Sequence, residues 1–429
     1  MKDILKKIIT AIITWEAKMV LKKYRPQVVA VTGNVGKTST TGALHVALRR
    51  AYFVRKSEKS YNSEIGVPLA ILGVLSAWTN PLGWARNILE GLRLIFLKNH
   101  YPKWLILEVG ADRPGDIARV AAWLRPDIVV VTKIGEIPVH VEFFASVDEV
   151  VAEKGTLVEA LAPEGLLVLD IDSPRAMSLA AKTTARVVTY GFAQEAHFVA
   201  SHAEIVYDKE SGAPEGITFK INHGTRSMPI RIRGTIGQHH AYPVLAAIAV
   251  SVSEGTNLVS AAQWIEEEYV PPAGRLRILK GIGESIVLDD TYNASPSAVQ
   301  AGLAALENVK GKRKIAVLGD MMELGRHSVE EHRKIGETVA EAADIFFAVG
   351  PRMKAAGEIA RGKRLKTIET FSDSREAGDA LRKILKAGDV VLVKGSQSTR
   401  MERVVEEIMA EPEKRKELLV RQDEEWQKR

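Results

Sequence analysis

The amino-acid sequence predicts an α/β protein with two sheets, the first of them mostly parallel. Short apolar runs without polar alternation, such as VVAVTG (28–33) and DIVVVTK (127–133), are typical of strands that helices cover on both faces. Helix-like stretches alternate with these runs, which is the pattern of a parallel sheet. The segment YVPPAGRLRIL (269–279), with paired prolines and a glycine, interrupts the pattern like a domain linker. A second alternating series follows it.

The elements of the first part follow in order from these patterns. Residues 1–25 predict an amphipathic helix, because lysines flank the apolar residues on both sides and no cleavage site of a secretory signal follows. The runs VVAVTG, WLILEVG, DIVVVTK and GLLVLD predict strands, with helix-like segments between them. A strand meander is expected over residues 197–234, and helices are expected near 240–253 and 258–268.

The second part repeats the alternation on a smaller scale. The runs SIVLDD, KIAVLGD, DIFFAVG and DVVLVKG predict the strands of a separate sheet. We therefore expect an N-terminal helix at 1–25, a central domain at 26–271 and a C-terminal domain at 272–429, and the two domains have common domain sizes.

Composition excludes several classes of function. The 429-residue chain has a formal net charge of +6 with interspersed charges and carries no zinc-finger, homeodomain or RNA-binding signature, so nucleic acid is not an expected partner. Cysteine is absent, which excludes disulfides and thiolate chemistry and suits a cytoplasmic protein. The longest apolar stretch, 65–78, is shorter than the roughly 18 to 20 residues of a membrane-spanning helix.

A candidate phosphate-binding loop, TGNVGKTST (32–40), follows the first predicted strand and begins a helix. In that context the backbone N–H groups and the helix N-terminus face an anion, the lysine reaches the terminal phosphates and the threonine hydroxyl meets magnesium. The spacing is shorter than the usual G-x-x-x-x-G-K-[ST], and the alternative is a plain glycine turn. The predicted nucleotide-binding residues of this loop are Gly33, Asn34, Gly36, Lys37, Thr38 and Ser39.

Polar residues at other strand ends are further candidates. Glu108 closes the WLILEVG strand, where ligands collect in an open α/β sheet, although such a glutamate is equally often a solvated loop residue. His140 and Lys154 carry less information when they are read alone, because a lone histidine is more often structural and a helical lysine is usually solvated.

Two runs after predicted strands, LDDTYNASP (288–296) and LVKGSQSTRMERV (392–404), hold more polar groups than a loop needs. The residues that would face a cleft are Asp289, Asp290, Asn293, Lys394 and Ser396. Helix capping by Asn293 or Ser295 is the competing explanation. Capping does not account for the paired aspartates.

The ordered motifs resemble those of the Mur ligase family, and most of all its D-alanyl-D-alanine-adding members. The resemblance rests on TGNVGKTST, YNSEIGVP, LEVGADRPGDIA, HVEFFAS, KGTLVEAL, PAGRLRIL, DDTYNASPSA, VLGDMMELG and LVKGSQSTRMERVV, and it covers roughly residues 26–408. It implies a P-loop central ATPase domain and a Rossmann-like C-terminal domain. The implied activity is ATP-dependent amide (peptide) ligation through an acyl phosphate, which forms ADP and phosphate.

The resemblance also implies roles for single residues. Lys37 would hold the phosphates of ATP, and Thr38 and Glu108 would hold one magnesium ion. His140 would help to hold a second ion, together with a carbamylated Lys154, because the carbamate is an anionic oxygen ligand whereas an ammonium repels magnesium.

The remaining implied roles belong to the nucleotide and the reacting centre. Asp290 matches a residue that contacts the ribose, and Arg275 lies in the linker motif that reaches the phosphates. Asn293 and Lys394 would face the reacting centre, which requires domain closure. His240 stands where the family has an asparagine near the adenine, and Gln397 replaces a common arginine on the acceptor side.

Two departures from the family shape the expected partners. Only about 25 residues precede the first strand, so we expect the family's N-terminal UDP-binding domain to be missing. The stretch 73–103 is a longer connection than expected and is rich in Trp, Leu and Arg. With the N-terminal helix it forms a hypothetical membrane-facing patch at the inner membrane face, and the alternative is that both helices simply pack on the core.

The expected partners are ATP, a peptide or muropeptide carboxylate and an amine, and the expected state is a monomer. Two other functions stay open. One is a related amide ligase with another product, such as poly-γ-glutamate. The other is a non-catalytic nucleotide-binding partner, against which the combination of Lys37, Thr38, Glu108, His140 and Lys154 argues.

Overall fold

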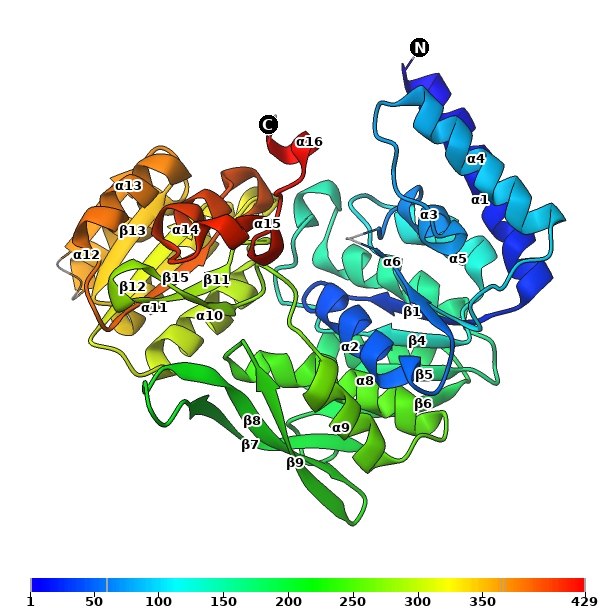
Figure 1. The fold of residues 1–429 in the computed structure, drawn as a ribbon, viewed down its shortest axis with the longest axis horizontal. Coiled ribbons are helices and arrows are strands. Elements are labelled where there is room, and N and C mark those ends of the chain that lie inside the picture. The colour runs from blue at the N-terminus through cyan, green and yellow to red at the C-terminus, as the bar shows by residue number, and fades with distance from the viewer. Residues whose placement is uncertain (1, 59–60, 364, 366, 428–429) are drawn as a thin grey trace.

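The computed structural model describes residues 2–58, 61–363, 365 and 367–427, and these residues form two sheets with helices around them (Figure 1). The larger sheet has nine strands in the order β2-β3-β1-β4-β5-β6-β7-β8-β9, and the smaller has six in the order β10-β11-β15-β12-β13-β14. The pairs from β2 to β7 are parallel. This architecture confirms the predicted α/β class with a mostly parallel first sheet.

The strands of the larger sheet are short and apolar at its centre, where helices cover both faces. They are β1 (Gln27–Thr32), β2 (Val54–Lys56), β3 (Trp104–Glu108), β4 (Ile128–Val131), β5 (Leu166–Asp170), β6 (Arg186–Gly191), β7 (Phe198–Tyr207), β8 (Pro214–His223) and β9 (Arg226–Arg233). Alternate side chains of β1 enter different cores, Val29 and Val31 one and Val28 and Ala30 the other. Two buried faces explain why these strands lack polar alternation.

The helices of this part fall into two groups according to the face they cover. Helices α2 (Lys37–Arg49), α8 (Ala241–Ser253) and α9 (Leu258–Glu268) contribute to the core that contains Val29 and Val31. The other core takes residues from α1 (Lys2–Tyr24), α3 (Gly66–Leu72), α4 (Pro81–Phe96), α5 (Asp116–Leu124), α6 (Val147–Glu159) and α7 (Pro174–Met177).

The last three strands of the larger sheet form an antiparallel extension, because β8 pairs with both β7 and β9 in opposite directions. This is the meander expected over residues 197–234. In Figure 1 it lies at the bottom of the molecule, below the smaller sheet.

The smaller sheet lies at the left of Figure 1. Its strands are β10 (Arg277–Lys280), β11 (Ile286–Asp290), β12 (Arg313–Gly319), β13 (Ile345–Val349), β14 (Thr367–Phe371) and β15 (Asp389–Lys394). Its helices are α10 (Pro296–Asn308), α11 (Ser328–Ala342), α12 (Met353–Lys363), α13 (Ser374–Ile384), α14 (Glu402–Ile408), α15 (Arg415–Leu418) and α16 (Glu424–Gln427). Strands β11 to β14 are parallel, and only β10 is antiparallel to its neighbour.

Helices α1 and α4 lie side by side and project from the larger sheet, at the upper right of Figure 1. Lys23 near the end of α1 donates to the carbonyl oxygens of Leu94, Ile95 and Leu97 at the end of α4, at 2.6 to 3.0 Å. A cation suits this position because the last carbonyls of a helix have no partners within the helix. Among the described helices, none is both long and apolar enough to cross a membrane.

Four strands have no counterpart among the predicted strands, namely β2, β6, β10 and β14. Strand β10 begins within the segment 269–279 that was expected to be only a linker. Strand β14 is the edge of the smaller sheet and pairs only with β13, and most of its side chains lie in solvent. An edge strand of this kind carries no apolar run for a sequence pattern to register.

Candidate active site

The loop between β1 and α2 has the backbone of an anion-binding turn. Gly33 has a φ of 133°, and a Cβ there would collide with the Thr132 side chain, so the position admits only glycine. Gly36 has a φ of 92° and caps α2 without any side-chain hydrogen bond. The first N–H groups of α2 therefore point out of the helix end without a side-chain cap.

Thr38, the second residue after Gly36, faces a carboxylate on the neighbouring strand. The Thr38 hydroxyl donates to Glu108 Oε2 at 2.9 Å, and Asn62 Nδ2 donates to Glu108 Oε1 at 3.3 Å. Glu108 is the last residue of β3, which pairs with β1, so the parallel register brings the ends of both strands to one edge. Glu108 is only 2% exposed.

This oxygen set fits a magnesium ion. Magnesium in nucleotide sites is usually held by one or two carboxylates together with phosphates and water, and Thr38 and Glu108 supply a hydroxyl and a carboxylate at the mouth of the phosphate loop. Among the described residues there is no cluster of three or more His, Asp or Glu side chains arranged to hold an ion. A site completed by phosphate oxygens does not need one.

Two lysines lie on the first sheet's side of the site, the half-buried Lys37 and the buried Lys154. Lys37 Nζ donates to the Gly33 carbonyl at 3.0 Å, and burial lowers the pKa of its ammonium, with Glu108 acting in the opposite direction. Burial lowers the pKa of Lys154, on α6, to about 7, and the charge of Lys37 adds to this effect. Lys154 is 2% exposed and has no hydrogen bond or ion pair within the described part of the chain. An unpaired buried ammonium is costly, which favours its neutral form.

Another lysine, Lys394 from the smaller sheet, lies in the same region together with its hydrogen-bond partners. Lys394, the last residue of β15, pairs with Asp290 Oδ2 at 2.7 Å and donates to the Asn293 carbonyl at 2.9 Å. Strands β11 and β15 are adjacent and parallel, with Asp290 opposite Lys394 in register. Burial raises the pKa of the neighbouring Asp289 to about 6 while Thr291 Oγ1 donates to it at 2.6 Å.

Arg275 connects the two sheets. Its Nη2 lies 3.5 Å from Thr38 Oγ1, and its guanidinium stacks on the Tyr292 ring at 3.9 Å from the centroid. Tyr292 is held from behind by Arg421 near the C-terminus, which donates to the carbonyls of Thr291 and Tyr292. The buried Nε of Arg275 has no hydrogen-bond partner among the described residues. Arg275 therefore adds a second cation to the cleft that Lys37 lines.

His140 also links the two parts of the chain. Its Nδ1 lies 2.6 Å from Glu323 Oε2 in the loop after β12, and its Nε2 lies 3.6 Å from Asp112 Oδ1. The structure therefore places carboxylates at both ring nitrogens and shows no contact between His140 and Lys154. The predicted second metal ion stays a prediction.

The predicted residues line two adjoining cavities between the sheets. The cleft at the phosphate loop is lined by Asn34, Gly36, Lys37, Thr38, Glu108, His140, Arg275 and Asn293. The deeper cavity is lined by Gly36, Ser39, His240, Arg275, Asp290 and Lys394. Gly33, within the loop, and Lys154, on α6, line neither of them. Asp289 and Ser396, which were expected to face a cleft, also line neither of them.

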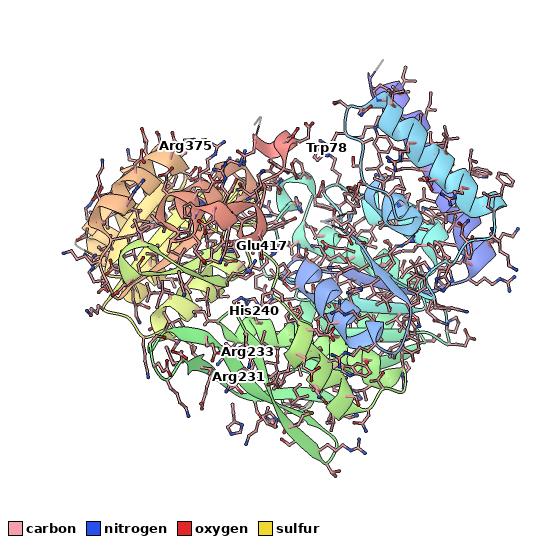
Figure 2. The ribbon with its side chains drawn as sticks, viewed as in Figure 1. Trp78, Arg231, Arg233, His240, Arg375 and Glu417 are labelled. Atoms are coloured by element: carbon pink, nitrogen blue, oxygen red, sulfur yellow. The ribbon has the colours of Figure 1, made fainter. Side chains whose placement is uncertain are left out.

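His240 lies at the centre of the molecule, between the two sheets (Figure 2). Its Nε2 lies 2.8 Å from Thr235 Oγ1, and its Nδ1 has no partner among the described residues. Burial holds its pKa well below the ordinary value, so the ring is neutral. A neutral imidazole with one free nitrogen is suited to a nucleotide base rather than to a phosphate.

Three residues of the site were not among the predicted ones. Asn62 contacts Glu108, Glu323 contacts His140, and Tyr292 carries Arg275. Each occurs in a motif quoted for the family resemblance, but nothing in its type or spacing sets it apart from a loop residue. Only the fold brings them to the cleft.

Two sequence profiles of one family match this chain. The profile of the Mur ligase middle domain matches residues 87–251, and that of the Mur ligase glutamate ligase domain matches residues 274–397. Together they cover more than half of the sequence.

Curated relatives extend the likeness to most of the chain. The UDP-N-acetylmuramoyl-tripeptide–D-alanyl-D-alanine ligase of Bacillus subtilis is 26% identical over 405 residues, which cover 92% of this chain and 79% of the relative. The enzyme of the same name from Mycobacterium leprae is 29% identical over 395 residues, covering 86% and 71%.

The crystal structure of MurF ligase from Thermotoga maritima in complex with ADP superposes with a TM-score of 0.75 at 25% identity, covering 95% of this chain and 84% of that one. The domain profiles, the relatives and this shared fold agree with the geometry of the cleft. The chain belongs to the Mur ligase family.

Proposed function

We propose that this protein is an ATP-dependent, ADP-forming peptide ligase that joins D-alanyl-D-alanine or a similar amine to the carboxylate of a cell-wall peptide. The observation that carries the proposal is the convergence of Lys37, Thr38 and Glu108 from the larger sheet with Arg275 and Asn293 on one cleft. The names of the relatives support this choice of substrates, a UDP-N-acetylmuramoyl-tripeptide and D-alanyl-D-alanine.

The chemistry proceeds in two steps, because a carboxylate is a poor electrophile. One carboxylate oxygen attacks the γ-phosphorus of ATP, the bond to the β-phosphate oxygen breaks, and an acyl phosphate and ADP form. The amine nitrogen then attacks the acyl carbon, inorganic phosphate leaves, and the nitrogen loses a proton. The protein contributes mainly positioning and stabilisation of negative charge.

The charged side chains divide this work between the two sides of the cleft. Lys37 and Arg275 place two cations in the cleft at the phosphate loop, where the transferred group would carry its negative charge. Asn293 faces the same cleft from the second part of the chain, and Lys394 holds the Asn293 backbone in place. Asp290 lines the deeper cavity, where it is proposed to contact the ribose, with His240 near the base.

The metal requirement belongs to the proposal as well. Thr38 and Glu108 would hold a magnesium ion, which when bound neutralises charge on the phosphates. The second ion would be held by His140 and a carbamylated Lys154. The Lys154 amine is suited to carbamylation because its pKa of about 7 leaves much of it neutral at neutral pH. A neutral amine attacks CO₂, forms the N–C bond and releases a proton.

Phosphate release tests the reaction. Purified protein is incubated with ATP, magnesium, UDP-N-acetylmuramoyl-tripeptide and either D-alanyl-D-alanine or glutamate, and products are identified by mass spectrometry. We expect phosphate and a pentapeptide product with D-alanyl-D-alanine, and neither in the Lys37→Ala variant. Turnover with glutamate alone would replace this function by that of a ligase with another product. Lack of turnover with every pair would favour a non-catalytic nucleotide-binding role.

The proposal also covers the oligomeric state and the cellular location of the enzyme. We propose a cytoplasmic monomer that touches the inner face of the membrane. Light scattering behind a sizing column checks the monomer, since a dimer would double the measured mass.

A further inference from the structure

The α1–α4 pair exposes an unusual amount of apolar surface, and this feature has no part in the ligase chemistry. Fifteen large hydrophobic side chains are strongly exposed among the described residues, and ten of them lie in residues 4–25 and 73–103. They are Ile4, Leu5, Ile8, Trp15, Leu75, Trp78, Leu82, Leu89, Phe96 and Leu97. Clusters of this kind on a folded protein mark an interaction surface.

Helix α1 is apolar on two opposite faces. Ile13, Ala17 and Val20 lie on the face that enters the core, and all three are fully buried. Ile4, Ile8 and Trp15 recur at spacings of four and seven residues, which places them on one stripe, and they are 65%, 51% and 48% exposed. Core packing therefore explains only the first face.

Helix α4 repeats this arrangement with charges added. Its buried face carries Trp84, Asn87 and Gly91. Its outer stripe reads Leu82, Arg86, Leu89, Arg93 and Phe96, at alternating spacings of four and three residues. Leu82 is 81% exposed, Leu89 65% and Phe96 74%. Apolar and basic side chains thus alternate along the outside of the helix.

The charge of the pair is strongly positive. Residues 4–25 and 73–103 hold ten basic and two acidic residues, and one of the two acids, Glu16, is buried. The net charge of this part exceeds the +6 of the whole chain, so the remainder is slightly acidic. A partner for this surface must be both apolar and anionic.

A second copy of the chain does not meet that requirement, because a symmetric contact would bring two basic surfaces together. An anionic bilayer does. Interfacial helices bury Leu, Phe and Trp at the boundary of the acyl chains while Lys and Arg reach the headgroups. The stripe on α4 has this composition.

We propose that the outer surface of α1 and α4 is a docking site for an anionic lipid bilayer, with Leu82, Leu89 and Phe96 inserted and Arg86 and Arg93 at the phosphate headgroups. The inference specifies the surface behind the membrane contact and does not depend on which amide the enzyme forms. Ile4, Ile8 and Trp15 of α1 enter the same boundary.

Vesicle flotation of the full chain tests the proposal. We expect the protein to float with vesicles of phosphatidylcholine and phosphatidylglycerol, and to float much less with phosphatidylcholine alone or at high salt. The L89D/F96D variant should bind at least about ten-fold more weakly, since two inserted side chains are replaced by charges. Its matched control is V259D/V270D, which alters exposed residues outside the pair, 55% and 68% exposed, and should bind like the wild type.

Further readouts separate binding from misfolding. The L89D/F96D variant should keep the circular dichroism and the ATP turnover of the wild type, and brominated lipids should quench wild-type fluorescence more than that of Trp15→Phe. Flotation that is unchanged by L89D/F96D, or absent for the wild type, overturns the proposal. A concentration-dependent dimer that L89D/F96D abolishes would assign the surface to a second copy instead.

Discussion

Glu16 provides the sharpest test of how α1 and α4 are held together. Its carboxylate is fully buried where the two helices meet, and a Cβ at Gly91 would collide with it. Neither of its oxygens has a hydrogen-bond partner among the described residues. Burial raises its pKa from 4.5 to about 7. We predict that Glu16→Gln, which keeps the shape but cannot ionise, removes a pH-dependent loss of stability.

The magnitude follows from the difference between the pKa of the folded protein and that of the unfolded chain. Because the folded-state pKa is raised, the folded protein holds a proton that the unfolded chain releases, so stability falls as pH rises from about 4.5 through about 7. A tenfold change in a proton-binding constant corresponds to about 1.4 kcal/mol, so the whole effect on the free energy of unfolding is about 3 kcal/mol. Most of this difference develops between about pH 4.5 and about pH 7, because above that range both states have lost the proton.

The suitable assay is hydrogen exchange of the α1 and α4 amides, because it reports the opening of this pair of helices by itself. Exchange is measured at the lower and the upper end of this pH range and corrected for the intrinsic exchange rate. The wild type should lose protection at the higher pH, and Glu16→Gln should keep it. Glu90→Gln is the matched control, since Glu90 lies on α4 with its side chain 42% exposed. Equal loss of protection in the wild type and Glu16→Gln would refute the reasoning.

Other predictions concern the cleft. Lys37→Ala should lower ADP formation by at least about a thousand-fold with unchanged circular dichroism, because it removes a cation from the phosphate loop. Glu108→Gln should raise the magnesium concentration needed for half-maximal activity, measured by titration of the ion. Lys154→Ala should abolish a carbamate signal in ¹³C NMR with labelled bicarbonate, and the wild-type signal should grow as pH rises through about 7. Tyr292→Leu should lower kcat about ten-fold by releasing Arg275.

The parts of the site on parallel strands could be predicted from the sequence. The carboxyl ends of β1 and β3 meet at one sheet edge, so a glutamate that closes one strand lies beside the loop that follows the other. The same logic applies to Asp290 and Lys394 on β11 and β15. In these cases an apolar run predicts the strand, and a polar residue at its carboxyl end lines one of the two cavities.

The contacts between the two parts of the chain could not be predicted in this way. Arg421 lies in a charged C-terminal stretch whose composition is typical of a solvated segment. Its side chain is nevertheless only 5% exposed, and it donates to the carbonyl oxygen of Thr291, next to Tyr292. Its pairing with Glu402 depends on how the C-terminal segment returns to β11, and no local pattern encodes that path. Strand β14 was missed for a related reason, since its residues carry no apolar signal.

The α1–α4 pair shows why one pattern supported two interpretations. The sequence offered core packing and membrane contact as alternatives, but each helix has a buried face and an exposed apolar face. A helix with apolar residues on two opposite faces does not show a single apolar stripe, so periodicity alone does not separate these roles.

The reacting cleft is held closed by a few polar contacts, and this has a consequence for turnover. Arg275 lies 3.5 Å from Thr38, and His140 lies 2.6 Å from Glu323 across the two parts of the chain. Contacts of this kind each contribute on the order of 1 kcal/mol. A sum of this size is small enough for the cleft to open, and a bound nucleotide would add contacts to both parts of the chain. Closure driven by the nucleotide, rather than by the protein alone, therefore fits a cleft whose cations, Lys37 and Arg275, come from distant parts of the chain.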